Sequence, residues 1–186
     1  ASAKKLNDLC RLIPDKSNIE LNLSGDKLNI STKNGKYSLA TLPSNEFPIF
    51  ESGDSLNSIT LRSQDLKTLI NSTSFAMGNQ DWRHYLNGLF LKLEEGVLTA
   101  VATDAHRLAL NCLDSVSDIN FSGIIPRKSV NEINRFIGDD NSELSLAIND
   151  TSLVLSNDNL TFKSKLIDGA FPDYNQVIPT GDSSLL

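Results

Sequence analysis

The apolar positions near the start of the chain change from helical to strand spacing. The first set has the i, i+3, i+4, i+7 spacing of an amphipathic helix and comprises Leu6, Leu9, Cys10 and Ile13. The next set alternates with polar residues, as half-buried strands do, and comprises Ile19, Leu21, Leu23, Leu28 and Ile30. This order predicts a helix followed by antiparallel strands, with turns at Gly25-Asp26 and Asn34-Gly35.

The same pattern returns later in the chain, where Pro126 to Pro172 repeats Ser2 to Pro48. The matching helical positions of the second copy are Lys128, Val130, Asn131, Ile133, Arg135, Ile137 and Asp139. After a slip of one residue, the matching strand positions are Leu144, Leu146, Ile148, Leu153, Leu155 and Phe162. The two copies are offset by 124 residues (126 − 2), about the size of a whole small domain, so we expect tandem domains of similar fold.

A third, diverged unit with the same order lies between the two copies. It has strand positions Ile59 and Leu61, then helical positions Leu66, Leu69, Ile70 and Met77, and then strand positions from Leu89 to Leu110. Ile124 and Ile125 form a further strand before the third helix. We therefore expect an α+β protein of tandem strand, helix, strand, strand, strand units, with helices on one face of antiparallel sheets.

Two such units make a domain, which predicts four segments. A strand precedes the second and third helices but none precedes the first, so residues 1–52 form the C-terminal half of a truncated first domain. Residues 53–57, with Gly53 and Asp54, form a linker. Residues 58–179 form a complete second domain, and residues 180–186 begin a linker to another domain.

Composition excludes several classes of protein. With 186 residues, 39% hydrophobic and 22% charged, the chain is typical of a globular protein. Its apolar runs are shorter than the roughly 18 residues of a membrane span, so we expect a cytoplasmic location. A net charge of −6 argues against coating nucleic acid by bulk electrostatics. Cys10 and Cys112 have neither disulfide nor metal spacing, so we expect buried free thiols, no metal and no cofactor.

Cations repeat on the polar faces of the predicted helices. Lys4, Asn7 and Arg11 have helical spacing, and Lys128, Asn131 and Arg135 repeat them, with a weaker version at Lys67 and Asn71. One interpretation is a solvated face. The other is a set of equivalent cationic stripes, which is the means by which proteins contact DNA phosphates without reading sequence.

Two short segments also hold candidate chemistry. Residues 79–86 concentrate Trp82, His84 and Tyr85 at a helix-to-strand junction, which indicates either an aromatic plug under a loop or a nucleic-acid contact loop. Asp104 and His106 resemble an acid–base pair of an enzyme. However, no nucleophile or second metal ligand accompanies them in a recognisable frame, and ordinary strands often have such i, i+2 neighbours.

Three separated stretches resemble the bacterial replicative sliding clamp, the beta subunit of DNA polymerase III. They are Tyr85 to Gly88, Ala102 to Ala109 and Ser164 to Tyr174. The resemblance covers the whole chain and implies a DNA-clamp fold, a ring-forming homodimer whose helices line a central hole and whose sheets form the outside. It implies a non-catalytic processivity factor that encircles duplex DNA without sequence preference. A fragment of this extent is expected to be monomeric, and no membrane is involved.

The resemblance also implies two sets of site residues. A cleft that binds short linear peptides of polymerase, clamp loader and repair proteins would comprise Leu86, Thr103, Ala105, His106, Arg107, Leu108, Pro172 and Val177. DNA contacts would comprise Lys4, Lys5, Gln80, Arg83, His84, Tyr85, Arg127 and Lys128. Family members commonly carry Gly at Ala105, Arg at Ala170 and basic residues at Asn175 and Gln176, so the rim is less basic here. The alternative is a tandem-domain scaffold that binds proteins without DNA function.

Overall fold

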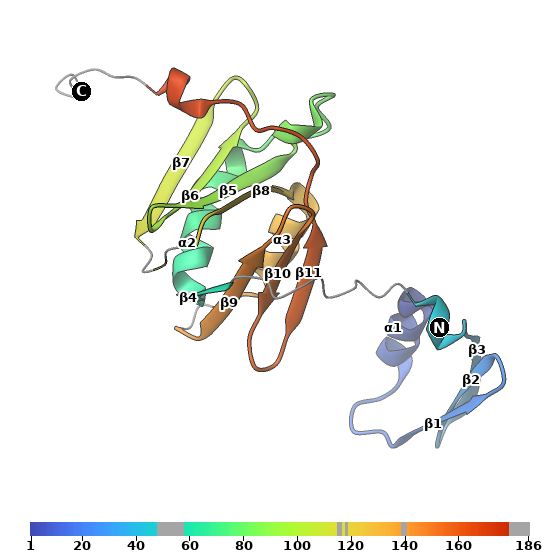
Figure 1. The fold of residues 1–186 in the computed structure, drawn as a ribbon. Coiled ribbons are helices and arrows are strands. Elements are labelled where there is room, and N and C mark those ends of the chain that lie inside the picture. Colours follow the sequence, from blue (N-terminus) through green and yellow to red (C-terminus); the bar gives the residue numbers. More distant parts are fainter. Residues whose placement is uncertain (48–57, 115–116, 118, 139–140, 179–186) are drawn as a thin grey trace. The chain divides into compact units, whose positions relative to one another are not determined.

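The computed structural model describes residues 1–47, 58–114, 117, 119–138 and 141–178. The chain divides into two compact units, Ala1–Glu51 and Ser52–Leu186, and each is described here by itself (Figure 1). The predicted linkers at 53–57 and 180–186 lie outside the described residues. Among the described residues, no helix combines the length and the apolar character needed to cross a membrane.

The first unit is a helix followed by a three-stranded antiparallel sheet. Its elements are α1 (Ala3–Leu12), β1 (Ile19–Ser24), β2 (Lys27–Thr32), β3 (Gly35–Ala40) and the short helix η1 (Ser44–Glu46), with strand order β1-β2-β3. Ser2 caps α1, because its Oγ accepts a hydrogen bond from the Lys5 backbone N–H at 3.5 Å. Gly25 has φ +59 and forms the β1–β2 turn with Asp26, as the sequence predicted.

The second unit consists of two halves with the same order of elements. The first half comprises β4 (Ser58–Arg62), α2 (Ser63–Thr73), η2 (Ser74–Ala76), η3 (His84–Leu86), β5 (Gly88–Glu94), β6 (Val97–Thr103) and β7 (Leu108–Asp114). The second half comprises β8 (Phe121–Pro126), α3 (Arg127–Phe136), β9 (Glu143–Ile148), β10 (Ser152–Ser156), β11 (Thr161–Lys165) and η4 (Tyr174–Val177). The expected α+β order of strand, helix, strand, strand, strand is confirmed.

The two halves of the second unit exchange their first strands. One sheet has the order β11-β10-β9-β4 and the other β7-β6-β5-β8, so β4 joins the sheet of the second half and β8 that of the first (Figure 1). Ile59 of β4 pairs with Leu146 of β9, and Ile125 of β8 pairs with Leu89 of β5. The apolar sides of both sheets and both helices enclose one core. The exchange makes the halves interdependent, because neither sheet is complete without a strand from the other half.

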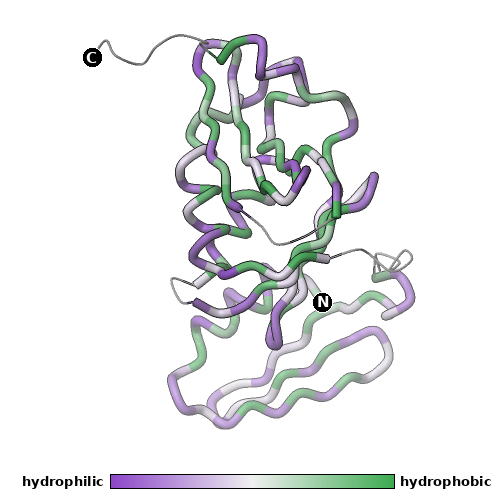
Figure 2. The backbone as a smooth tube through the Cα atoms, turned by 60° about the vertical axis from the view of Figure 1, so that its left-hand side comes forward, coloured by the Kyte–Doolittle hydropathy of each residue, from purple (hydrophilic) through white to green (hydrophobic). Residues whose placement is uncertain are grey.

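The strand pairing reproduces the register of the sequence repeat. Ile30 pairs with Tyr37 in the first unit, and their predicted equivalents Leu155 and Phe162 pair in the second. Apolar and polar residues alternate along β1 and β2 of the first unit (Figure 2). The slip of one residue between helix and strands is therefore real, since the wrong register would turn every side chain to the opposite face.

Burial differs sharply between the two copies. Leu146 is 1% exposed and Ile148 7%, whereas their equivalents Leu21 and Leu23 are 63% and 65% exposed. In the second unit β4 pairs with β9, and α2 contributes to the shared core. The described part of the first unit offers one α-helix and three strands, too little apolar surface to enclose the same side chains.

Three local expectations are wrong. The helix α2 ends at Thr73, and Met77 is buried in extended backbone after the 3₁₀ turn η2. The β2–β3 turn is Lys33-Asn34, because Gly35 already pairs with Thr32. Cys10 and Cys112 are free, as expected, but both are exposed.

Candidate functional site

All eight residues of the predicted peptide cleft line one pocket of about 430 Å³ in the second unit. Leu86 comes from η3, Thr103 from the end of β6, Leu108 from the start of β7, and Pro172 and Val177 from the segment after β11. Arg83, Tyr85, Phe171, Asp173 and Tyr174 also line it. Three separate stretches of sequence therefore meet at one end of the strand-exchanged domain.

The turn between β6 and β7 forms one rim of the pocket and is held by its own side chains. Thr103 Oγ1 donates to the Arg107 carbonyl oxygen at 2.7 Å and accepts from the Ala105 N–H at 3.0 Å. Ala105 has φ +72, in the left-handed region that favours glycine. The hydrogen bonds of Thr103 hold this conformation, so the turn keeps its shape although alanine stands where the resemblance implies glycine.

Asp104 also belongs to this turn rather than to an acid–base pair. Its Oδ1 accepts from the backbone N–H groups of His106 and Arg107, each at 3.0 Å, and its Oδ2 accepts from Arg107 Nε at 3.1 Å. The His106 N–H is the main cause that lowers the pKa of the Asp104 carboxyl, followed by the contacts with Arg107. The pair is therefore joined through the His106 backbone, and among the described residues no hydrogen bond links the Asp104 carboxylate to the His106 imidazole.

Arg107 is directed by contacts with the segment after α2. Its Nη2 donates to the Phe75 carbonyl oxygen at 2.9 Å, and the guanidinium carbon lies 5.7 Å from the centre of the Phe75 ring. The side chain remains more than half exposed. It can therefore still offer donors to a ligand at the pocket rim.

Aromatic stacking orders the wall of the pocket that the segment after β11 forms. The ring of Phe171 stacks on the ring of Phe90 with centroids 4.8 Å apart, and the ring of Tyr174 packs against Phe90 with centroids 6.3 Å apart. Asp173 caps η4, because it accepts from the Asn175 N–H at 3.1 Å and from Gln176 Nε2 at 3.0 Å. These bonds lower the pKa of Asp173, with Gln176 as the first cause. Asn175 and Gln176, at positions where the resemblance implies basic residues, thus stabilise the wall locally.

The loop from Gly78 to Asn87 is closed by two reciprocal hydrogen bonds between Asp81 and Asn87. The Asp81 N–H donates to Asn87 Oδ1 at 2.9 Å, and Asn87 Nδ2 donates back to the Asp81 carbonyl oxygen at 2.8 Å. The Gly78 N–H donates to the Leu86 carbonyl oxygen at 2.8 Å. These bonds stabilise the conformation in which Gln80 has φ +58, an unusual value for a residue other than glycine.

Arg83 forms a bidentate ion pair with Asp81. Nε lies 3.0 Å from Oδ1 and Nη2 2.8 Å from Oδ2. The hydrogen bonds from Arg83 lower the pKa of Asp81 to about 2. In this loop Trp82 is 82% exposed, and the Arg83 guanidinium carbon lies 5.7 Å from the centre of the Trp82 ring. The interpretation of this segment as a buried aromatic plug is therefore wrong.

Arg127 connects this loop to the start of α3. Its Nη1 donates to the carbonyl oxygens of Met77 and Gly78 at 3.0 and 3.1 Å, and its backbone N–H donates to the Asn87 carbonyl oxygen at 3.0 Å. The predicted DNA contacts of the second unit therefore fall on one loop and the adjoining helix end. They are Gln80, Arg83, His84, Tyr85, Arg127 and Lys128. Lys4 and Lys5 are exposed on the first unit.

The cationic faces of α2 and α3 differ in the contacts that their side chains make with the rest of the fold. On α3, Lys128, Asn131 and Arg135 are exposed, and the ion pair of Arg135 with Glu132, at 3.4 Å, is its only one among the described residues. On α2, Lys67 Nζ donates to the Ile137 carbonyl oxygen at 3.3 Å, and Asn71 accepts a hydrogen bond from Asn134 of α3 at 2.9 Å. The weaker stripe on α2 therefore joins the two helices.

The strand-exchanged fold is that of solved DNA sliding clamps. The DNA polymerase III subunit beta from Pseudomonas aeruginosa superposes with a TM-score of 0.89 and 38% identity, covering 96% of this chain and 50% of that one. Another structure of the clamp from this organism, bound to griselimycin, has a TM-score of 0.89 and 37% identity, covering 97% and 50%. The class defined by the fold is therefore the DNA sliding clamp.

Sequence comparison gives the family. Residues 60–173 match the family described as DNA polymerase III beta subunit, central domain, and residues 1–51 match its N-terminal domain. The Beta sliding clamp of Pseudomonas aeruginosa is 37% identical over 186 residues, which cover 99% of this chain and 51% of that protein. The chain belongs to the DNA polymerase III beta subunit family, as its sequence motifs predicted. It spans about half the length of the curated relatives that it matches.

Proposed function

We propose that the protein containing this chain is a sliding clamp, a non-catalytic processivity factor that encircles duplex DNA and tethers the replicative polymerase. Clamp loader and repair proteins would bind the same cleft through short linear peptides. The observation that carries the proposal is the convergence of all eight predicted cleft residues on one pocket. Family membership supports it. Tethering works because a bound polymerase is held at a high local concentration near its template.

The pocket has the features that an extended peptide needs. Leu86, which is 2% exposed, and Leu108 form an apolar floor on which a peptide side chain can be buried. Arg107 and the turn around it place polar groups at the rim, where they can bind peptide backbone. Val177 is 66% exposed, so one wall is thin. The resemblance assigns the rest of that wall to a third clamp domain, outside residues 1–186.

Peptide binding by this chain is accordingly expected to be weaker than micromolar, because a half-walled pocket must offset the entropy lost on ordering a flexible peptide. Calorimetry with a hydrophobic pentapeptide that begins with Gln measures it. Leu108→Asp should abolish the heat of binding, while Leu110→Asp, on the same strand but outside the pocket, should not. Sub-micromolar affinity, or an unchanged affinity for Leu108→Asp, contradicts the proposed cleft.

DNA would be held by exposed cations that are not already used by the fold. Lys4, Lys5 and Lys128 are exposed, and no ion pair to them occurs in the part of the chain that the structure describes. Replacing all three with Glu in the full-length protein should shorten the lifetime of loaded clamp on nicked circular DNA, and the difference from wild type should shrink at higher salt, because salt screens the charge contacts that wild type makes. An unchanged lifetime favours the alternative, a protein-binding scaffold without DNA function.

The domain and assembly predictions belong to the same proposal. Residues 1–52 would be the end of a first clamp domain and residues 58–179 a second, a division supported by the compact units and the two family matches. The full-length protein would close as a homodimeric ring in the cytoplasm. The chain alone lacks complete ring interfaces and should sediment as a monomer at micromolar concentration.

A further inference from the structure

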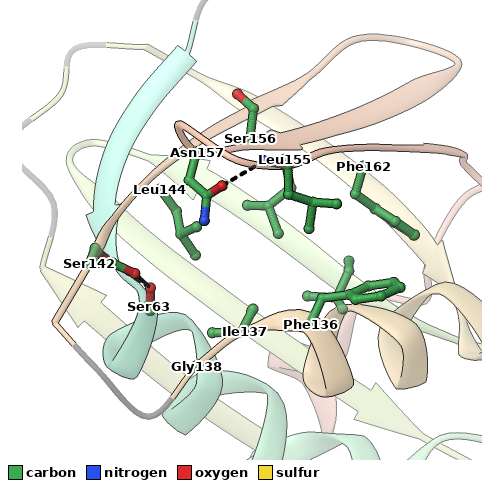
Figure 3. Close-up of a pocket in the computed structure, with 12 residues that line it drawn as sticks. Ser63, Phe136, Ile137, Gly138, Ser142, Leu144, Leu155, Ser156, Asn157 and Phe162 are labelled. Atoms are coloured by element: carbon green, nitrogen blue, oxygen red, sulfur yellow. Dashed lines mark hydrogen bonds between the residues drawn. The ribbon is translucent and has the colours of Figure 1, made fainter. Parts of the chain in front are cut away.

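A second pocket lies at the opposite end of α3 from Arg127, between that helix and the β10–β11 hairpin (Figure 3). It has a volume of about 210 Å³ and shares none of its lining with the cleft. Ile133, Phe136 and Ile137 form one side and Leu155, Leu160 and Phe162 the other. Phe136 is 53% exposed although its ring lies only 6.2 Å from that of Phe162, so the pocket opens beside an aromatic pair.

The size of the pocket limits the ligand to a single ring. A cavity of about 150 Å³ is enough for benzene, and drug-sized ligands occupy at least about 300 Å³. Two phenyl rings at the wall give an aromatic ligand partners for tilted or offset stacking. The ligand should also be neutral, because no charged side chain of the described residues lines the pocket to compensate for the lost hydration of an ion.

A hydrogen-bond donor on an exposed residue lies at the rim of these apolar walls. Asn157 Oδ1 accepts from the backbone N–H groups of Asn159 at 3.0 Å and Leu160 at 2.8 Å. These two bonds fix which end of the amide is oxygen, because only oxygen can accept both. The remaining Nδ2 points towards the pocket (Figure 3), and it makes no hydrogen bond within the described ranges 1–47, 58–114, 119–138 and 141–178.

The end of the pocket beside α2 is closed by a pair of hydroxyls. Ser63 Oγ lies 2.5 Å from Ser142 Oγ and 2.9 Å from the Ser142 carbonyl oxygen. These hydroxyls already satisfy one another, whereas Asn157 Nδ2, on an exposed residue, can exchange water for an acceptor of a ligand. A ligand that fits this pocket therefore presents one hydrogen-bond acceptor to Asn157 and apolar surface to the other lining residues.

We propose that this pocket binds a free, neutral, single-ring aromatic molecule that carries one carbonyl group. The ring lies between Phe136 and the apolar residues of the β10–β11 hairpin, and the carbonyl oxygen accepts from Asn157 Nδ2. The site is independent of the peptide cleft and of DNA, so it stands whether or not the clamp function holds.

Two probes separate the apolar and polar parts of the site. Benzamide carries the ring and the carbonyl group, while toluene carries the ring alone. Amide NMR titration of the 186-residue chain should show both binding, benzamide with a dissociation constant of about 1 mM, as expected for so small a ligand. The shifts should centre on Phe136, Leu160 and Phe162.

Asn157→Asp keeps the oxygen that caps the hairpin and removes the donor. It should weaken benzamide about five-fold, the value of one net hydrogen bond, and leave toluene unchanged. Phe136→Ala should weaken both probes, whereas Phe75→Ala, an equally exposed phenylalanine outside the pocket, should weaken neither. The proposal is overturned if neither probe shifts these residues at about 10 mM, or if Asn157→Asp or Phe136→Ala leaves benzamide affinity unchanged.

Discussion

Arg127 and Gly78 are joined by a hydrogen bond of 3.1 Å from Nη1 of the arginine to the carbonyl oxygen of the glycine. The same Nη1 reaches Met77, and the Arg127 backbone reaches Asn87, so the first residue of α3 holds both ends of the loop that displays Trp82. A residue assigned to DNA by resemblance thus has a structural role. The roles are compatible, since a guanidinium has five donors and these bonds use only Nη1.

Replacing Arg127 should therefore cost stability that replacing its neighbour does not. Arg127→Gln removes charge-assisted bonds to two carbonyl groups of a half-buried site and should lower the free energy of unfolding by about 1–2 kcal/mol. Lys128→Gln, at an exposed position, should change it by less than about 0.5 kcal/mol. Urea denaturation of the two variants measures the difference. Equal stabilities would mean that the Arg127 contacts do not hold the loop.

The ion pair of Asp81 with Arg83 predicts an unusual titration. The pKa of Asp81 is lowered to about 2, so the stabilisation from the ionised carboxylate is complete above its ordinary pKa of 3.8 and is lost as the pH falls through about 2. Carboxyl ¹³C shifts followed from pH 5 downwards should locate this midpoint. In Arg83→Gln the midpoint should rise towards the ordinary value. A wild-type midpoint near 4 would show that the pair does not form in solution.

Repeated apolar spacing was enough to predict most of the fold, because one pattern met twice specifies both elements and register. The pairing of Ile30 with Tyr37, and of Leu155 with Phe162, is a case where sequence comparison alone found the correct slip. The exchange of β4 and β8 was not predicted, since strand order depends on contacts between halves that no local spacing encodes. The unequal burial of Leu21 and Leu146 was not predicted either, because their sequence patterns are the same and burial depends on which other elements pack against each strand.

The site was predicted less evenly than the fold. Resemblance brought together residues as distant as Leu86 and Val177, which the structure places around one pocket. It could not show that Arg83 is paired with Asp81, because a motif gives residue types but not their partners. Phe90 was missed as the centre of the aromatic wall, since an apolar strand residue gives no signal of the rings that stack on it.

Trp82 gives a direct measurement of the displayed loop. It is the only tryptophan and is 82% exposed, so its fluorescence should match that of hydrated indole and be quenched efficiently by acrylamide. Trp82→Ala should change the free energy of unfolding by less than about 0.5 kcal/mol, because little apolar surface returns to water. A blue-shifted, protected emission would support the buried plug instead.

Gly88 and Gly123 both lie in strands of the same sheet, yet they should respond differently to alanine. A Cβ added at Gly88 would lie 2.5 Å from the carbonyl oxygen of Ile125, whereas one at Gly123 would meet a terminal methyl of Leu166 at 2.6 Å. Backbone in a paired strand cannot move away without breaking the ladder between β5 and β8, but a half-buried leucine can change rotamer.

Gly88→Ala should therefore lower the free energy of unfolding by about 3 kcal/mol. Gly123→Ala should stay within about 1 kcal/mol of wild type, because the loss of unfolded-state entropy partly offsets the repacking. Because Gly88 follows Leu86 and Asn87, the first variant should also weaken peptide binding at the cleft, while the second should not. Thermal and urea denaturation with calorimetry test both parts. If the two variants proved equally stable, the close approach of β5 and β8 at Gly88 would be wrong, and with it the rigid floor on which Leu86 is placed.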